Sequence, residues 1–538
     1  MSRLRRDAAE TRVVGVLYER RPAKTLAQRM AVWRKKSTRL VYWRYVVHRI
    51  ATRMESGLAN LLHAVIRIIH AAPRNPNGTS AFELDDLRST CEGQGAALLI
   101  TSDIHSGESL DFVRNLGPDL GLVFGARILK PVLYEIPKHG SINIHKRKVP
   151  DYRGGGPVGL WELLDHQKEI GVTVHRVEAK VDVGAVIRSA VIPIEPMDDL
   201  ESLALKADVV GADLIVAAAR DFANGTVSEK PQASGGKTYR GPAAEDLLQM
   251  EKKIASRGGS DHNPFRRPVW KLLLKSLLFA LPVALRNRRH RREGTFPVMI
   301  LYHHLVSDRP HRFGSSTVDF LRLTNYLLRH YRIVPLSEAV ALIRKGGVKE
   351  PTVAVTFDDG YAENFVNLRA VTDPTGLPIG YFISTAHIGT GRQFAHDEMF
   401  NEHGFLPNTW EQIEFLKRCG YEIGSHTRSH ADCGSTDVEF LRNEIEGSCE
   451  DLRQRIGGTG LFSFPFGLPA NISQPAAEIA CACYESVFSA YGGENTCRDQ
   501  RRILRRGAFP HTLWELELVL QTVHSAVKEP GYLQKEIN

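Results

Sequence analysis

The chain has 538 residues, enough for two or three domains, and its 43% hydrophobic and 24% charged residues are ordinary for a globular protein. The net charge of +9 is concentrated in a few arginine-rich runs, which argues against a protein that binds nucleic acid throughout. The seven cysteines include no Cys-x-x-Cys pair, so they indicate small buried side chains in a reducing compartment, not a metal site.

Two segments expected in secreted or membrane proteins are missing from the sequence. The first ten residues contain no apolar core of a signal peptide. No run of eighteen uncharged apolar residues occurs, so no membrane-spanning helix is predicted. We therefore expect a cytoplasmic protein, with the inner surface of the membrane as the other location.

Residues 30–53 interleave aromatic side chains with many arginines. Sites for single-stranded nucleic acid use such interleaving. An amphipathic helix that packs its aromatic side chains on a sheet explains the pattern equally well. We favour the helix, take an anionic membrane surface as the next alternative, and predict no nucleic-acid partner.

Strands and helices alternate in the first half of the chain. Alternation of this kind predicts an α/β unit with an open, mostly parallel sheet. The predicted strands are 13–18, 96–100, 120–124, 141–145 and 171–175, and the predicted helices are 109–116 and 161–165.

Polar residues follow the apolar parts of these strands, where open α/β sheets bind their ligands. In chain order they are Asn143, His145, Tyr152-Arg-Gly154, Gly171-Val-Thr173, Asp182 and Gly184. This set resembles the folate-dependent formyltransferases, which include enzymes acting on methionyl-tRNA, glycinamide ribonucleotide and sugar nucleotides. The resemblance covers about residues 90–232.

The resemblance implies formyl transfer from formyl-tetrahydrofolate to an amine. It makes Asn143, His145 and Asp182 the catalytic trio, with Asn143 and Asp182 also binding the cofactor. Formyl transfer passes through a tetrahedral oxyanion, to which an amide or imidazole can donate. The amine must lose a proton, which His145 or a water held by Asp182 can accept.

The sequence departs from this family in two places. Family members begin with a strand, a glycine-bearing loop and a helix before the strand that we predict at 13–18, and that unit is not recognisable here. That unit helps to build the sheet and part of the site in the family. The loop after His145 reads Lys-Arg-Lys-Val-Pro, and its extra cations suggest a phosphate-bearing substrate.

Residues 233–295 are predicted to form a connector. Within it, the apolar run 269–285 is followed by five arginines between 286 and 292. The run is too short and too charged to span a bilayer. Two alternatives remain: the segment 269–292 lies in a membrane interface, or it docks the two domains.

The second half is organised around Val353-Ala-Val-Thr-Phe-Asp-Asp-Gly360. The apolar residues predict a buried strand, and the two carboxylates at its tip need a cation to offset burial. Further on, His426 and His430 are four residues apart, so that one helical turn would place both imidazoles on one face. One carboxylate and two imidazoles make an open zinc-type site.

Thr356-Phe-Asp-Asp-Gly360 and His426-Thr-Arg-Ser-His430 resemble the first two motifs of the polysaccharide deacetylases, relatives of chitooligosaccharide deacetylase. The resemblance implies a distorted β/α barrel in which Asp359, His426 and His430 bind a divalent metal, most simply zinc. It also implies that Asp358 is the base, and that the N–H of Phe466 donates to the oxyanion. His511 is the candidate general acid.

One family feature is absent from its usual position. Many members carry an arginine shortly before the proline of the third motif, and it pairs with the catalytic acid. The corresponding segment here, Leu461-Phe-Ser-Phe-Pro465, has no arginine, and we expect Arg502, Arg505 or Arg506 to substitute.

The sequence thus predicts a formyltransferase-like domain at 1–232, a connector at 233–295 and a deacetylase domain at 296–538. The joint hypothesis is a multifunctional enzyme of carbohydrate metabolism: a hydrolase that removes N-acetyl groups from an amino sugar, sugar nucleotide or lipid-linked saccharide, coupled to N-formylation. In a second hypothesis only the deacetylase works and the first domain is a non-catalytic binding module. In a third, the whole chain is a non-catalytic scaffold.

Overall fold

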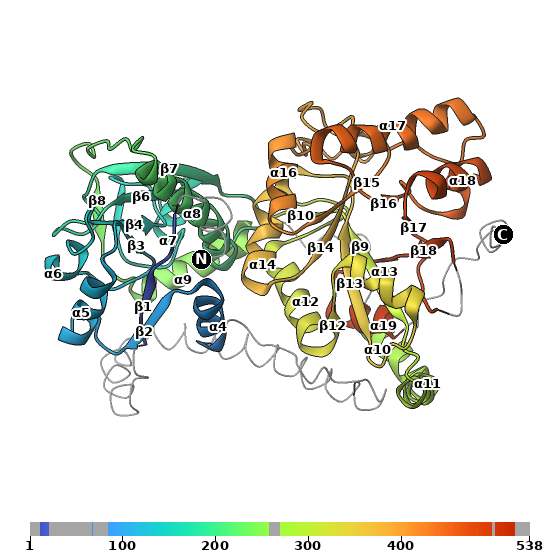
Figure 1. The fold of residues 1–538 in the computed structure, drawn as a ribbon, viewed down its shortest axis with the longest axis horizontal. Coiled ribbons are helices and arrows are strands. Elements are labelled where there is room, and N and C mark those ends of the chain that lie inside the picture. Colours follow the sequence, from blue (N-terminus) through green and yellow to red (C-terminus); the bar gives the residue numbers. More distant parts are fainter. Residues whose placement is uncertain (1–10, 21–66, 68–83, 258–268, 498–500, 522–538) are drawn as a thin grey trace. The chain divides into compact units, whose positions relative to one another are not determined.

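The computed structural model describes residues 11–20, 67, 84–257, 269–497 and 501–521, and they divide into two compact units (Figure 1). The first contains the described residues 11–20 and 84–257, and the second contains Arg67 and the described residues from 269. The aromatic and basic segment 30–53 lies outside the described residues. The domain boundaries at 232 and 295 stay predictions.

The first unit is α/β, as predicted, and its sheets contain both parallel and antiparallel pairs. Parallel pairs are β1–β2, β3–β4 and β5–β8, whereas β4–β6 and β6–β7 are antiparallel. The strands are β1 (Gly15–Glu19), β2 (Ala97–Thr101), β3 (Gly121–Val123), β4 (Ser141–His145), β5 (Tyr152–Gly154), β6 (Glu169–Arg176), β7 (Val186–Pro193) and β8 (Lys237–Tyr239). The helices are α4 (Leu84–Gln94), α5 (Gly107–Leu116), α6 (Pro131–Tyr134), α7 (Leu160–Leu164), α8 (Leu200–Ala223) and α9 (Ala244–Arg257).

Helix α8 anchors the core of this unit. It begins at a capping box, in which the side chain of Asp199 accepts from the N–H of Ser202 and the side chain of Ser202 accepts from the N–H of Asp199. Its buried Leu203 and Ala207 pack with Val172 of β6 and with other apolar residues of α7 and α9. The sheet that carries the predicted site residues is therefore held rigidly from one face.

The second unit is a distorted β/α barrel, as predicted. Its strands run in the order β18-β17-β16-β15-β14-β13-β9-β19, and every pairing is parallel. The strands are β9 (Val298–His303), β10 (Leu305–Val306), β11 (Gly314–Ser315), β12 (Arg332–Ile333), β13 (Thr352–Phe357), β14 (Ile379–Ile383), β15 (Glu422–Ser425), β16 (Leu461–Ser463), β17 (Ser486–Ser489), β18 (Ile503–Arg505) and β19 (Gly507–Ala508). Only Arg506 separates β18 from β19. One short segment therefore pairs with β17 on one side and with β9 on the other, and the sheet nearly closes.

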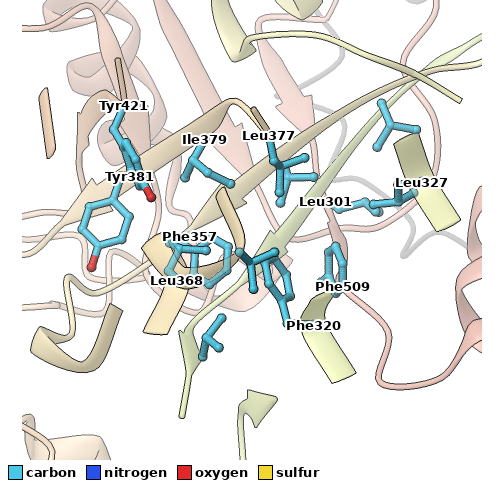
Figure 2. Close-up of a cluster of buried hydrophobic side chains, with 14 of the residues drawn as sticks. Leu301, Phe320, Leu327, Phe357, Leu368, Leu377, Ile379, Tyr381, Tyr421 and Phe509 are labelled. Atoms are coloured by element: carbon cyan, nitrogen blue, oxygen red, sulfur yellow. The ribbon is translucent and has the colours of Figure 1, made fainter. Parts of the chain in front are cut away.

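Helices surround this barrel. They are α12 (Thr317–His330), α13 (Leu336–Lys345), α14 (Asn367–Thr375), α15 (Ala395–Met399), α16 (Trp410–Arg418), α17 (Val438–Ile456), α18 (Gln474–Cys483) and α19 (Leu513–Leu520), with short 3-10 turns η1 (Ala362–Phe365) and η2 (Pro469–Asn471). Figure 1 shows α12, α14 and α16 along one side of β9, β13 and β14. Figure 2 shows the core between these layers, where Leu301 of β9 and Phe357 of β13 meet Phe320 and Leu327 of α12. This packing fixes the strand tips that carry the candidate site.

Helices α10 (Val269–Leu278) and α11 (Ala280–Glu293) pack against the barrel unit with one face. Leu272 is buried with Trp514 and Leu518 of α19, and the side-chain N–H of Asn287 donates to Gln521 at 2.8 Å. The opposite face exposes five leucines at helical spacing: Leu274, Leu277, Leu278, Leu281 and Leu285. Among the described helices, none is both long and apolar enough to cross a membrane.

Candidate active sites

Asp358 and Asp359 directly follow β13, whose six residues are all buried. The N–H of Asp358 still donates to the backbone oxygen of His303 at 2.9 Å, so this residue continues the strand. Asp359 has a φ of 71°, a left-handed conformation that costs a non-glycine residue about 1–3 kcal/mol. Because the chain turns there, the two carboxylates face different partners.

Asp359, His426 and His430 form the metal-type cluster that the two motifs predict. Oδ1 of Asp359 lies 3.2 Å from Nε2 of His430 and 3.6 Å from Nε2 of His426. The three candidate ligand atoms lie within 4.8 Å of one another. Nδ1 of His426 donates to the backbone oxygen of Ser463 at 2.8 Å, so its Nε2 keeps a lone pair that faces the cluster.

The donor set fits a divalent cation such as zinc. Both carboxylate oxygens of Asp359 are buried and accept no hydrogen bond from any residue that the structure describes. Burial alone would raise the pKa of Asp359, but His430 and the neighbouring imidazoles outweigh burial and hold its pKa well below the ordinary value. Burial lowers the pKa of His426 to about 4, so its imidazole is neutral at pH 7. An anionic oxygen and neutral nitrogens are the ligands that zinc takes.

Asp358 is held by Arg506, the residue between β18 and β19. The guanidinium donates from Nη1 to Oδ1 at 2.7 Å and from Nη2 to Oδ2 at 2.8 Å, and Nη1 also donates to Oγ1 of Thr356 at 3.0 Å. Burial would raise the pKa of Asp358, but Arg506 and His426 outweigh it, so the pKa is lowered and the carboxylate stays ionised. Of the three arginines that the sequence offered, Arg506 is the one that replaces the missing motif arginine.

The two remaining predicted residues of this site are less closely tied to it. Nδ1 of His511 lies 3.5 Å from Oγ of Ser315, which is 3.0 Å from Nε2 of His303. His511 as general acid stays a prediction. Phe466 has a φ of 58°, and its ring lies edge-on to His430 at 4.9 Å. Its N–H donates to no residue in the described parts of the chain and is therefore open to an oxyanion.

Sequence analysis missed a polar group beside the metal-type cluster. Nε2 of His396 lies 3.6 Å from Oδ2 of Asp359 and 2.8 Å from the hydroxyl of Tyr361. That hydroxyl also contacts both oxygens of the buried Asp397, at 2.9 and 3.1 Å. The only sequence signal was the position of Tyr361 directly after Gly360. His396 lies 37 positions beyond Asp359, in the short helix α15, and no recognised motif includes it.

The formyltransferase-like residues also converge. Asp182, with a φ of 54°, places Oδ2 at 3.5 Å from Nδ1 of His145 and Oδ1 at 3.5 Å from Nε2 of His175. Nδ2 of Asn143 lies 3.3 Å from Nε2 of His175. The structure thus brings Asn143, His145 and Asp182 together and adds His175, which pairs with Asn143 across β4 and β6. His175 could have been predicted only from the antiparallel register of β4 and β6, and the sequence does not reveal that register.

Hydrogen bonds fix the proton positions of these imidazoles. Nε2 of His145 donates to the backbone oxygen of Tyr152 at 2.9 Å, so Nδ1 is the proton-accepting atom when the ring is neutral. Burial lowers the pKa of His145 and favours that neutral form. Burial would raise the pKa of Asp182, but His175, His145 and the N–H of Gly154 outweigh it and lower the pKa.

The cations after His145 are engaged within the unit. Arg147 is buried, with Nη1 at 2.9 Å from Oε2 of Glu162 and Nη2 donating to the oxygen of Pro157 at 2.6 Å. Lys146 pairs with Asp208. Arg147 is therefore unavailable to a substrate phosphate, and the phosphate interpretation of this loop is wrong for that residue.

Two family models match the chain. Residues 74–219 match the family described as formyl transferase, and residues 345–480 match the family described as polysaccharide deacetylase. Each match covers part of the chain, and the two together confirm the predicted combination of domains.

Individual relatives cover either half. The methionyl-tRNA formyltransferase of Thermodesulfovibrio yellowstonii is 29% identical over 191 residues, 35% of this chain and 60% of that protein. The methionyl-tRNA formyltransferase of Geobacter sulfurreducens is 40% identical over 114 residues, 21% of this chain and 35% of that protein. The chain thus spans 35–60% of the length of these two relatives.

Among solved structures, IcaB from Ammonifex degensii has a TM-score of 0.37 and 20% identity, covering 42% of this chain and 97% of that chain. The formyltransferase PseJ from Anoxybacillus kamchatkensis has a TM-score of 0.26 and 21% identity, covering 32% of this chain and 87% of that chain.

Replacing Arg506 with glutamine tests the pairing of Asp358. Burial then acts without the guanidinium, so we expect the pKa of Asp358 to rise and the free energy of unfolding at pH 7 to fall by about 3–5 kcal/mol. In the native protein, the lowered pKa stabilises the fold above about pH 4 and the effect is lost as pH falls through the folded pKa. In Arg506→Gln the dependence reverses, because stability falls as pH rises. Denaturant titrations from pH 3 to pH 8 measure both the loss of unfolding free energy at pH 7 and its dependence on pH.

The matched control is Arg505→Gln, since Arg505 is the neighbouring arginine and does not contact Asp358. It should retain the native pH dependence. The same pH profile in both variants would contradict the pairing.

Proposed function

Because the chain joins a formyl transferase domain to a polysaccharide deacetylase domain, we propose that it exchanges N-acyl groups on an amino sugar. The second unit hydrolyses the C–N bond of an N-acetyl group, and the first unit formylates an amine of the same kind. The observation that carries this proposal is the buried pair Asp358–Asp359, in which one carboxylate is paired with Arg506 and the other faces two imidazoles without a hydrogen bond among the described residues.

The residues of the deacetylase site divide the chemistry between them. Asp359, His426 and His430 hold a divalent metal, most simply zinc, which when bound polarises the amide carbonyl and lowers the pKa of water. Asp358 accepts the proton of the attacking water, since Arg506 keeps the carboxylate ionised and oriented.

The remaining roles in this site concern the oxyanion and the departing amine. The N–H of Phe466 donates to the oxyanion that develops on the acetyl oxygen. His511 protonates the departing amine.

In the formyl transfer site, one side chain donates a hydrogen bond to the oxyanion and another accepts the proton of the amine. With formyl-tetrahydrofolate as donor, the amide of Asn143 donates to the tetrahedral oxyanion. Nδ1 of His145 accepts the proton of the attacking amine, and Asp182 stabilises the imidazolium from 3.5 Å. Asn143 and Asp182 also contact the cofactor.

The convergence of Asn143, His145 and Asp182 supports two activities over the alternative, in which the first unit is a degenerate binding module. The carboxylate of Asp359, which accepts no hydrogen bond from the described residues, likewise supports catalysis over a pure scaffold. We propose that the substrate is an amino sugar in a precursor, either nucleotide-linked or lipid-linked, and that the protein acts in the cytoplasm. Its seven free cysteines suit that reducing compartment.

The deacetylase proposal predicts release of acetate. Full-length protein incubated with zinc and an N-acetylated sugar nucleotide or glycolipid should release acetate, and a chelator should abolish the release until zinc is restored. Asp358→Asn should lower the rate by about 10²–10⁴-fold because the base is lost, while zinc binding by the folded variant persists because the three metal ligands are unchanged. Zinc-loaded protein that releases no acetate from any such substrate would refute it.

The formyl transfer proposal predicts a second, separable activity. With formyl-tetrahydrofolate and an amino-sugar nucleotide, the full chain should form a formamide, detected by mass spectrometry. Asp182→Asn should reduce this by about 10²–10⁴-fold. Each variant is the control for the other, since Asp358→Asn should keep formyl transfer and Asp182→Asn should keep acetate release. Failure of the native chain to bind formyl-tetrahydrofolate in calorimetry would favour the binding-module alternative.

We also propose that residues 269–292 contact an anionic membrane surface. Leu278 and Leu281 are 69% and 68% exposed, and Arg288 and Arg292 continue the same helical spacing beyond Leu285. Apolar side chains that can enter the acyl boundary, followed by cations at headgroup level, suit a helix lying on an anionic bilayer.

Vesicle sedimentation tests this contact. We expect the full chain to bind vesicles rich in phosphatidylglycerol, to bind phosphatidylcholine vesicles more weakly, and to be released by salt. The double variant Leu278→Gln, Leu281→Gln should lose binding, whereas Leu468→Gln, at an exposed leucine elsewhere, should not. Equal binding by the double variant would contradict the proposal. A concentration-dependent dimer that the double variant abolishes would instead indicate a second copy of the chain on this face.

A further inference from the structure

A chain of four buried or half-buried polar side chains runs behind the metal-type cluster. It begins at His311 and passes through Asp397 and Tyr361 to His396, which faces Asp359. The side chains of His311 and Asp397 are 0% and 1% exposed. Burying an imidazole and a carboxylate is costly, so their hydrogen bonds must be satisfied in one definite arrangement.

The direction of each hydrogen bond follows from the first. The N–H of Phe313 donates to Nδ1 of His311 at 3.1 Å, so the proton of this neutral ring is on Nε2, which donates to Oδ1 of Asp397 at 3.1 Å. An ionised carboxylate only accepts, so the hydroxyl of Tyr361 also donates to Asp397.

The single hydroxyl proton of Tyr361 is therefore committed to the hydrogen bond with Asp397. Its oxygen must accept from His396, whose Nε2 lies at 2.8 Å and therefore carries a proton. The backbone of Tyr361 is fixed as well, since its carbonyl oxygen accepts from the hydroxyl of the core residue Tyr381 at 3.1 Å (Figure 2 shows Tyr381).

We propose that His396 is a positioning residue that presents Asp359 to the metal through one oxygen. The protonated Nε2 of His396 lies 3.6 Å from Oδ2, whereas Oδ1 faces the two ligand imidazoles at 3.2 and 3.6 Å. The N–H donates to Tyr361 and forms no hydrogen bond with Oδ2, but its partial positive charge lies 3.6 Å from Oδ2, as it does from Oδ1 of Asp397, and stabilises negative charge on Oδ2. Oδ1 is thereby left as the ligand atom. This inference rests on the proposed metal site.

The competing assignment makes His396 a further metal ligand. A ligand nitrogen needs a free lone pair, and the hydrogen-bond directions place a proton on the nitrogen that faces Asp359. Removing the acceptor of that proton separates the two assignments. Tyr361→Phe weakens metal binding if His396 acts through its N–H. The same variant leaves binding unchanged or tighter if His396 ligates through Nε2.

The experiment measures zinc affinity of the full-length apo-protein by chelator competition, with cobalt absorption spectra as a second readout. We expect His396→Ala to weaken zinc binding about 10–100-fold, the usual effect of losing a group that orients a metal ligand. His396→Gln should restore most of the affinity, because its amide N–H replaces the N–H of Nε2. The matched control is His403→Ala, at an exposed histidine that contacts Asn401.

The outcomes are separable. Zinc affinity unchanged in His396→Ala, or weakened equally in His396→Gln, overturns the positioning role while the metal site stands. Unchanged or tighter affinity in Tyr361→Phe overturns it in favour of direct ligation. If the native protein binds no zinc, the proposed function and this inference fall together. Weakened binding in His396→Ala and Tyr361→Phe, with rescue in His396→Gln and an altered cobalt spectrum in His396→Ala, supports the inference.

Discussion

Two adjacent carboxylates at the buried tip of β13 are the constraint on which the barrel unit depends. Asp358 and Asp359 are 3% and 1% exposed, and an isolated buried carboxylate costs several kcal/mol unless a cation compensates it. Arg506 compensates the first through two hydrogen bonds. Because Arg506 is also the residue between β18 and β19, the segment that nearly closes the barrel delivers the guanidinium to Asp358. Folding and ionisation of Asp358 are therefore linked, and the second carboxylate remains for a different cation.

The parts of this arrangement that the sequence predicts are those encoded locally. The segment Val353–Gly360 predicts a buried strand with charged residues at its tip. His426 and His430 are four residues apart, a spacing that predicts a shared metal site. Arg506 could be named only as one of three candidates, because it meets Asp358 across 148 positions and only through the closing of the sheet. The pairing is therefore a property of strand order, which no local pattern carries.

The same reasoning explains what was missed in each unit. His175 lies beside Asn143 because β6 pairs antiparallel with β4 in that register. The sequence predicted the strand that contains His175 but not the register of its pairing. His396 reaches Asp359 from the short helix α15, which the buried Asp397 ties to His311. Arg147 shows the opposite error: its charge in a loop suggested a ligand, but burial beside Glu162 makes it structural. Local patterns thus gave strands and motifs, while partners depended on register and burial.

The two sites share a local design and differ in the partners of the acid. Asp182 and Asp359 both adopt positive φ, 54° and 71°. Asp182 faces two imidazoles at 3.5 Å, and Asp359 faces three between 3.2 and 3.6 Å away. Asp182 also accepts the N–H of Gly154 at 2.9 Å, so its charge is stabilised by the protein itself and its imidazoles can serve proton transfer. Asp359 accepts no hydrogen bond from the described residues. An acid flanked by imidazoles is therefore left to an added cation where no backbone N–H donates to it, as at Asp359, and is stabilised by the protein where one does, as at Asp182.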